Sequence, residues 1–321
     1  MQETKTRRLR LYLKWIGWVL AVQLVLANIS AAIYAYRFTH FYTGPVQRHS
    51  TRNFFSKTWK LFTGPKFYKL SQEAEPAFSY KKITLLTNSG DTIDGWYSGV
   101  DSSKSCVLLL HGITTNKSFL EEEALQFRSL GYNVLLIDFR GHGKSSGNTT
   151  TTGISEIEEV KMAFEFAKDS GNEKIIVYGV SLGAVVALNA TAKEKIHPNA
   201  IIADMPFDNL HNHLKARAKD VGFPSQPFAF LVTFWIGAEH GFNAFDHNAV
   251  DYAKKIHCPV LLQWGEHDRF VNRKAIKDIF QHLASNNKYL AVYPDADHES
   301  LLRNDPVMWN REVGNFLKKI D

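Results

Sequence analysis

Short apolar runs alternate with amphipathic segments over residues 79–321, about three quarters of the chain. The first two runs alternate apolar with polar positions and flank the turn residues Asn88-Ser-Gly-Asp91, so they predict an antiparallel hairpin. The later runs are mostly apolar, as is typical of strands buried on both faces. The predicted strands are residues 82–87, 93–97, 106–110, 134–137, 174–178, 200–203, 260–264 and 289–293.

Segments with apolar residues at helical spacing lie between these strands, and Gly131 and Gly171 follow two of them as helix C-caps do. A hairpin followed by alternating strands and helices predicts an α/β fold with a mainly parallel, eight-stranded sheet covered by helices on both faces. Ligands bind outside the carboxyl ends of the strands in such sheets. The predicted helices are residues 117–130, 154–168, 182–192, 271–283 and 306–319.

The N-terminal pattern is different and predicts a membrane anchor. Residues 15–36 are 22 positions without a charge, enough for a helix of about 33 Å that crosses a bilayer. Trp and Tyr residues lie near both ends of this run, where aromatic rings favour the interface. Five basic residues precede the run and three follow it within residues 37–52. We therefore expect a single pass, with the basic tail 1–14 cytoplasmic and the remainder outside the cytoplasm.

A cleaved secretory signal is the alternative, because Ser30-Ala31-Ala32 has the small residues of a cleavage site. Cleavage would release a secreted or periplasmic protein. The apolar run is longer than a typical signal core, which favours the retained anchor. Residues 37–78 are rich in aromatic and basic side chains, so they predict a connector of one or two amphipathic helices. This connector is expected to pack on the globular domain or to lie along the membrane.

Composition changes this picture little. The chain has 321 residues, of which 45% are hydrophobic and 22% charged, as in ordinary globular proteins. The net charge of +6 is concentrated in the first 70 residues and is attributed to the membrane flanks, since no nucleic-acid-binding motif accompanies it. Cys106 and Cys258 each precede an apolar run and are interpreted as buried thiols, not as a disulfide or metal ligands.

The segment Gly179-Val-Ser-Leu-Gly183 follows a predicted strand and opens a predicted helix, as a nucleophile elbow does. A sharp turn at this place needs small residues two positions before and after the serine. It exposes the hydroxyl of Ser181 at a helix N-terminus, where amide dipoles favour negative charge. Ser181 is therefore the predicted nucleophile, with Gly179 and Gly183 as supporting residues.

A serine hydroxyl needs a base that takes its proton and a third group that orients the base. His298 and Asp268 each follow a predicted strand, so both are expected at the sheet edge that carries Ser181. The chain order serine, acid, histidine fits this assignment, with His298 as the base and Asp268 as the acid. Asp204 also follows a strand and is the alternative acid.

Acyl transfer further requires donors for the oxyanion. Leu182 supplies the backbone N–H directly after the serine, and Ile113 is the expected second donor. Ile113 belongs to His111-Gly112-Ile113, which follows the third strand. His111 and Gly112 are thus expected to position this loop and to take no part in the chemistry.

The chain closely resembles the α/β-hydrolase superfamily over roughly residues 80–321. Within the superfamily it looks most like the serine-aminopeptidase and monoacylglycerol-lipase-like branch. The resemblance implies the α/β-hydrolase fold and hydrolysis without a cofactor. One departure is Asp297, because the family often has glycine directly before the catalytic histidine; it bears on the loop and on the environment of the histidine. The segments that carry the resemblance are the elbow, His111-Gly112, Asp138-Phe-Arg-Gly-His-Gly-Lys-Ser145 (structural in the family), Trp264-Gly-Glu-His-Asp268 and His298.

Residues 205–257 interrupt the alternation of strands and helices within the 79–321 domain, and on this fold such an insertion forms a cap over the site. Its middle, residues 223–237, is rich in Phe and Trp. This composition favours a pocket for apolar acyl or alkyl groups, although such a stripe also serves to pack the cap on the core. Together with the anchor, it points to esters of lipid or other hydrophobic acids as substrates.

The predicted function is a carboxylic ester hydrolase that forms an acyl-enzyme. A peptidase or thioesterase with the same triad and a non-catalytic binding scaffold are the alternatives. Nucleotide binding is rejected, because Asp138 stands where a phosphate loop ending in Gly143-Lys144-Ser145 needs glycine. A metal site is also rejected, because no Cys or carboxylate cluster accompanies His211 and His213.

Overall fold

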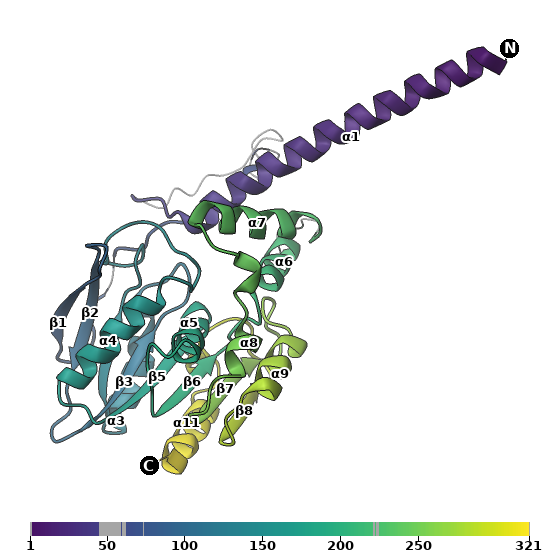
Figure 1. The fold of residues 1–321 in the computed structure, drawn as a ribbon. Coiled ribbons are helices and arrows are strands. Elements are labelled where there is room, and N and C mark those ends of the chain that lie inside the picture. The colour runs from purple at the N-terminus through teal and green to yellow at the C-terminus, as the bar shows by residue number, and fades with distance from the viewer. Residues whose placement is uncertain are drawn as a thin grey trace.

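The computed structural model describes residues 2–44, 59, 62–72, 74–220, 222 and 225–320, with side chains from residue 7 onward. Figure 1 shows an α/β domain from which one long helix, α1, projects. The helices are α1 (Gln2–Thr39), α3 (Glu121–Ser129), α4 (Ile157–Asp169), α5 (Leu182–Ala192), α6 (Leu210–Asp220), α7 (Phe228–His240), α8 (Ala249–Ala253), α9 (Arg273–His282), α10 (Leu301–Asn304) and α11 (Pro306–Ile320), with short 3₁₀ helices η1 (Lys117–Leu120) and η2 (Ala244–Asp246).

The eight strands form one sheet in the order β1-β2-β4-β3-β5-β6-β7-β8. Only the pairings β1–β2 and β2–β4 are antiparallel, and the other five pairings are parallel. This confirms the predicted mainly parallel sheet. The strands are β1 (Lys81–Leu86), β2 (Thr92–Ser98), β3 (Ser105–Leu110), β4 (Asn133–Ile137), β5 (Lys174–Val180), β6 (Ala200–Asp204), β7 (Val260–Gly265) and β8 (Lys288–Tyr293).

Helices cover both faces of the sheet (Figure 1). On one face, α4, α5, α8 and α9 form a continuous row. On the other face, α3 packs on α11 through Phe127 and Trp309, whose ring centroids are 5.5 Å apart, and the Tyr178 ring of β5 lies 5.5 Å from Phe127. The central strands are buried on both sides, which explains why their sequences are mostly apolar.

The predicted cap interval, 205–257, holds α6, α7, η2 and α8. Helices α6 and α7 stand over the carboxyl ends of the strands, whereas α8 belongs to the row that covers the sheet. The cap has a hydrophobic core that is separate from the core of the sheet. The C-terminal part of α1 contributes side chains to this core. Val221, Phe223 and Pro224 of this interval lie outside the described residues. The shared core consists of Ala31, Tyr34, Ala35, Phe38, Leu210, Leu214, Ala218, Phe228, Ala229, Val232, Ile236 and Ala244.

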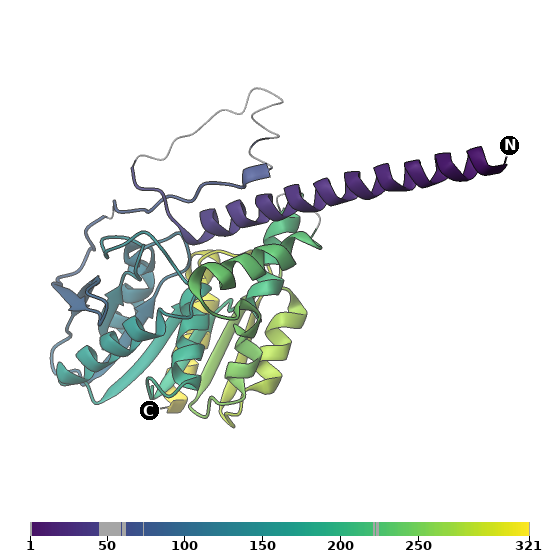
Figure 2. The ribbon, with the colours of Figure 1, turned by 45° about the horizontal axis from the view of Figure 1, so that its top comes forward.

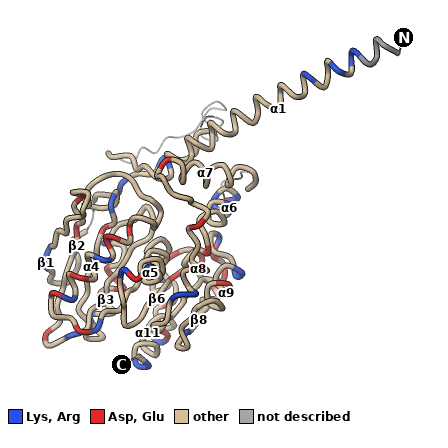
Figure 3. Tube along the Cα trace, viewed as in Figure 1, with Lys and Arg blue, Asp and Glu red and all other residues tan. Residues whose placement is uncertain are grey.

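Helix α1 is long and apolar enough to cross a membrane over Arg7–Thr39. Its middle carries no charge, and basic residues lie toward its N-terminal end (Figure 3). Only 11% of its most apolar window is buried within the protein. The part that is buried lies along α7 (Figure 2), where Trp235 Nε1 donates a hydrogen bond to Asn28 Oδ1 at 3.0 Å.

Of the predicted connector 37–78, residues 45–58, 60–61 and 73 lie outside the described residues. Its described parts contact one another and the domain. Arg37 Nη1 donates to Thr63 Oγ1 at 2.7 Å, and Tyr42 forms a β-bridge with Tyr68. The Lys69 ammonium donates to the Gly147 carbonyl at 2.9 Å, which ties this segment to the loop after β4.

Candidate active site

Ser181 occupies a strained turn between β5 and α5, with φ of 51° and ψ of −108°. The turn is possible because neighbouring positions carry no Cβ atom. A Cβ at Gly179 would lie 2.5 Å from the Gly183 carbonyl, and one at Gly183 would lie 2.1 Å from the Leu110 carbonyl oxygen. The Ser181 amide donates to the Asp204 carbonyl at 2.8 Å, which fixes the turn against β6.

Three side chains form a continuous hydrogen-bonded chain at the carboxyl ends of β5, β7 and β8. Ser181 Oγ lies 3.0 Å from His298 Nε2, and His298 Nδ1 lies 2.7 Å from Asp268 Oδ2. The other Asp268 oxygen accepts hydrogen bonds from the amides of Phe270 and Val271, both at 2.8 Å. A carboxylate beside Nδ1 keeps the proton on that nitrogen, so Nε2 presents its lone pair to the serine hydroxyl.

Asp204, the alternative acid, is turned away from His298. Its Oδ2 accepts from the Tyr178 hydroxyl at 2.7 Å and its Oδ1 from Gln263 Nε2 at 2.9 Å, while Gln263 Oε1 accepts from Tyr293 at 2.7 Å. Complete burial raises the pKa of the Asp204 carboxyl to about 7. This network joins β5, β6, β7 and β8 beneath the site and leaves Asp268 as the acid that contacts the imidazole.

The loop after β3 comes close to the serine. A Cβ on Gly112 would lie 3.7 Å from Ser181 Cβ. His111 Nε2 accepts from the Phe139 amide at 3.0 Å, and Nδ1 lies 2.7 Å from the Gly112 carbonyl. Burial lowers the pKa of His111 to about 4, so the imidazole is neutral and donates through Nδ1. His111 therefore joins the loops after β3 and β4, as its predicted positioning role requires.

The segment 138–145 holds a buried ion cluster below this loop. Lys117 Nζ lies 2.7 Å from Asp138 Oδ2 and 2.8 Å from Asp94 Oδ1. The amides of Lys117 and Lys144 donate to the Asp138 carboxylate at 2.7 and 2.9 Å. Gly143 has no room for a side chain, because its Cβ would lie 2.0 Å from Asp138 Oδ2. Gly143 and the Lys144 amide thus hold the loop against Asp138.

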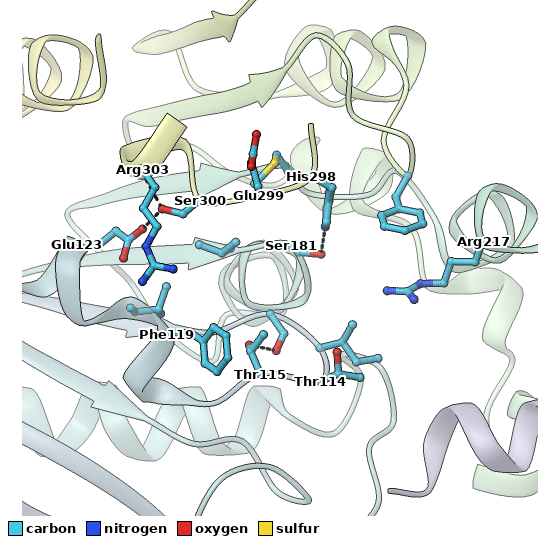
Figure 4. Close-up of a pocket in the computed structure, with 16 residues that line it drawn as sticks. Thr114, Thr115, Phe119, Glu123, Ser181, Arg217, His298, Glu299, Ser300 and Arg303 are labelled. Carbon is cyan, nitrogen blue, oxygen red and sulfur yellow. Dashed lines mark hydrogen bonds between the residues drawn. The ribbon is translucent and has the colours of Figure 1, made fainter. Parts of the chain in front are cut away.

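A cavity of about 390 Å³ opens beside Ser181 and His298. Figure 4 shows its lining: Glu123, Ser300 and Arg303 gather on one side of the serine, and Arg217 of α6 lies on the other. Much of the remaining wall is apolar or carries hydroxyl groups. These residues are Gly112, Ile113, Thr114, Thr115, Phe119, Leu120, Val180, Met205 and Phe270, with Glu299 at the rim beside His298.

Among the described residues of the segment 223–237, no aromatic side chain lines this cavity, contrary to the acyl pocket expected there. Within the described part of this segment, Phe228, Val232 and Ile236 pack on α1. Phe230 and Phe234 lie on the outer face of α7, and each is 50% exposed. The apolar wall of the cavity comes instead from the loops after β3 and β7 and from η1.

Two features of the site lacked any signal in the sequence. Glu123 is buried in the cavity wall, where Oε1 accepts from Ser300 Oγ at 2.7 Å and burial raises the pKa of the carboxyl. Arg217 reaches the cavity from an insertion whose helices had no predicted boundaries.

Asp297, the departure from the family pattern, accepts from the His298 amide at 2.7 Å and from Arg269 Nε at 2.9 Å.

Among the described residues, no group of three or more His, Cys, Asp or Glu side chains is arranged to hold a metal ion. His211 and His213 point to different partners. His211 Nδ1 lies 3.2 Å from Thr233 Oγ1, and His213 Nε2 accepts from Arg217 Nε at 2.8 Å.

Comparisons with known proteins agree with this geometry. A family model described as serine aminopeptidase, S33, matches residues 101–229 and 240–306. The uncharacterized protein YqkD of Bacillus subtilis is 25% identical over 236 residues, covering 72% of this chain and 77% of YqkD. The lysophosphatidylserine lipase ABHD12 of Danio rerio is 28% identical over 208 residues, covering 61% of this chain and 51% of the lipase. The solved structure of the Pyrococcus furiosus esterase Pf2001 superposes with a TM-score of 0.65 at 26% identity, covering 78% of this chain and 98% of the esterase.

Proposed function

This chain belongs to the serine aminopeptidase S33 family of α/β hydrolases, and we propose that it is a membrane-anchored serine hydrolase that cleaves carboxylic esters of hydrophobic or lipid-like acids. The observation that carries the proposal is the chain of hydrogen bonds from Asp268 through His298 to Ser181, at 2.7 and 3.0 Å, with Ser181 and His298 in the wall of one cavity. A hydroxyl in this arrangement has a base within reach of its proton and a carboxylate that orients the base.

In the proposed reaction, Ser181 Oγ attacks the ester carbonyl carbon while His298 Nε2 takes the hydroxyl proton. The carbonyl π electrons move to the oxygen, which becomes the oxyanion. When the tetrahedral intermediate collapses, the bond to the alcohol oxygen breaks and His298 returns the proton to the departing alcohol. Water then attacks the acyl-enzyme with His298 again as the base, and the acid product leaves. Asp268 keeps the imidazole in the required tautomer and stabilises the transient imidazolium.

The oxyanion is assigned to the backbone amides of Ile113 and Leu182. Leu182 is the first residue of α5 and follows the nucleophile directly, so its N–H belongs to the unsatisfied donors of a helix N-terminus. Ile113 lies in the loop that Gly112 brings against Ser181. Donors held in place in this way need no rearrangement when charge develops on the oxygen.

Hydrophobic substrates are supported by the apolar part of the cavity wall, which includes Phe119, Leu120 and Phe270. Two relatives act on related chemistry according to their names, one as an esterase and one as a lysophosphatidylserine lipase. The lipase is about twice as long as the region matched here, so its substrate is a guide to the ester class only.

A retained anchor is proposed in preference to a cleaved signal. Cleavage near Ser30-Ala31-Ala32 would remove Asn28, which binds Trp235 of the cap, and would cut into the core that α1 shares with α6 and α7. In the proposed arrangement α1 crosses the membrane once, with its basic N-terminus cytoplasmic and the hydrolase domain outside the cytoplasm. Comparing the N-terminus of the mature protein by mass with that of the translated chain tests retention.

The decisive experiment treats the detergent-solubilised full chain with a fluorophosphonate probe and maps the labelled peptide by mass. We expect the label on Ser181, and none on the Ser181→Ala variant. The same pair is then assayed with oleoyl esters. A folded wild-type protein that neither takes the label nor hydrolyses any ester would contradict the proposal and favour a non-catalytic scaffold, whose biological activity Ser181→Ala would retain.

A peptidase or thioesterase is the second candidate. It is favoured by the family description and by Glu123 of the cavity wall. The buried Oε2 of Glu123 has no hydrogen-bond partner within the described part of the chain, and a carboxylate there can bind a peptide ammonium. Aminoacyl amides and oleoyl thioesters, assayed beside oleoyl esters, distinguish these candidates from the ester hydrolase. A higher kcat/KM for amides than for oleoyl esters would contradict the proposed ester hydrolase and favour a peptidase.

A further inference from the structure

Arg217 of α6 lines the active-site cavity without a carboxylate partner among the described residues. Figure 4 shows its guanidinium directed toward the middle of the cavity, across Ser181 from Glu123 and Arg303. The acid nearest to it along the helix, Asp220, pairs instead with Arg269 at 3.7 Å. A cation withdrawn from water without a counter-ion costs free energy, so its presence here points to an anion that arrives from outside.

The guanidinium is held in place by contacts that leave its terminal nitrogens available. Its carbon Cζ lies 5.4 Å from the centroid of the Phe38 ring and 4.9 Å from that of Phe270, both within cation–π distance. Its Nε donates to His213 Nε2 at 2.8 Å. Burial and the neighbouring Arg217 charge lower the pKa of His213 well below its usual value, so this imidazole stays neutral and accepts the bond.

No hydrogen bond from Nη1 or Nη2 of Arg217 reaches another residue in the described part of the chain. These two nitrogens form the planar fork that binds phosphate or carboxylate oxygens in pairs. A side chain whose Nε is anchored and whose plane is packed between aromatic rings loses little entropy when an anion binds. Its surroundings come from three regions of the chain, namely α1, the cap and the loop after β7.

We propose that Arg217 binds an anionic group of the substrate, a phosphate or a carboxylate, and that the enzyme therefore selects hydrophobic esters with a negative charge near the ester bond. This inference rests on the proposed ester hydrolase. The anion lies on the Arg217 side of Ser181. On the opposite side Arg303 is already paired with Glu122 at 2.8 Å, and Glu123 and Glu299 add acidic groups there. The cavity thus orients the ester by charge as well as by apolar contact.

The test compares three oleoyl esters that differ in one group: 1-oleoylglycerol, 1-oleoylglycerol 3-phosphate, and 3-O-oleoylglycerate, which carries a carboxylate. Oleate release by the full chain in nonionic micelles gives kcat/KM for each. We expect wild type to prefer one or both anionic esters, and the two anionic arms identify which group binds. Arg217→Met should lower kcat/KM for the preferred anionic ester by about 10- to 100-fold more than it lowers kcat/KM for 1-oleoylglycerol.

Lys219→Met is the matched control, because it removes one positive charge from the exposed side of the same helix and should leave the preference unchanged. If Arg217→Met fails to fold, Arg217→Lys keeps the charge, loses the fork, and should lose most of the preference. Equal kcat/KM of wild type for all three esters, or an equal loss on all three in a folded Arg217 variant, would overturn the inference. Absence of both oleate release and Ser181 labelling in wild type would instead refute the proposed function.

Discussion

Arg269 and Asp297 join the two loops that carry the acid and the base of the candidate triad. Arg269 lies next to Asp268, and its amide and Nε donate to Asp297 at 3.1 and 2.9 Å. Asp297 precedes His298 and accepts from the amide of that histidine at 2.7 Å. The ion pair thus fixes the loop after β8 against the loop after β7. It depends on Asp297, the position at which the family often has glycine.

Asp297→Ala should release this link without unfolding the protein. Both side chains of the pair are partly exposed, so the free energy of unfolding should change by less than about 1 kcal/mol. The position of His298 should become less defined, and kcat should fall by about 3- to 10-fold with KM nearly unchanged. Ester kinetics beside thermal unfolding measures both. If kcat fell only because less of the variant is folded, this result would contradict a positioning role for Asp297.

Asp268→Asn and Asp204→Asn should affect different properties. The first replaces the carboxylate beside His298 Nδ1 and should lower kcat by about 10³- to 10⁴-fold, because an amide favours the wrong imidazole tautomer. The second changes a carboxyl that contacts Tyr178 and Gln263, so kcat should fall less than about tenfold in the protein that remains folded. The same kcat assay on both variants checks this, and the reverse order would make Asp204 the acid.

Phe38→Ala should show that α1 is part of the folded domain. Phe38 is 1% exposed and lies in the core shared with the cap, so its truncation should lower the free energy of unfolding by about 3 kcal/mol. Trp18→Ala is the control on the same helix, since Trp18 is 71% exposed and should change stability by less than about 0.5 kcal/mol. Chemical unfolding in one detergent measures the two variants. Equal stability of both would mean that α1 does not pack on the cap.

His247 should make the folded state sensitive to acid. It is buried between Tyr252 and the Thr152 carbonyl, and burial lowers its pKa to about 4 from 6.5. The unfolded chain therefore takes up a proton near pH 6.5 while the folded protein does not. The stability from this group is complete above pH 6.5 and is lost as the pH falls toward 4.

His247→Gln should consequently reduce the loss of unfolding free energy between pH 7 and pH 5 by about 2 kcal/mol. The comparison uses unfolding curves of wild type and variant at both pH values. His282→Gln replaces an exposed histidine and should follow wild type. If His247→Gln and wild type lose the same free energy over this range, then His247 is protonated in the folded protein.

The amino-acid sequence alone determined the strands of the sheet, the five helices α3, α4, α5, α9 and α11, and Ser181 and His298 as the candidate nucleophile and base. Strands and helices follow from apolar spacing within short segments, which is why the prediction of α5 as residues 182–192 agrees with the structure to the residue. The elbow is partly local, because the clash that requires Gly179 is with Gly183 and Ala184, within one strand–turn–helix unit. Parallel strands with carboxyl ends on one edge then bring Ser181, Asp268 and His298 together.

Other features depended on contacts between segments far apart in the chain. The order β4 before β3 in the sheet, the choice of Asp268 over Asp204 beside the imidazole, and the packing of α7 on α1 have no local signature. The same apolar stripe on α7 fits a pocket wall or a helix interface, and only the presence of α1 decided for the interface. Arg217 shows the limit most clearly, because one arginine on a cap helix becomes a site only when Phe38, Phe270 and His213 surround it.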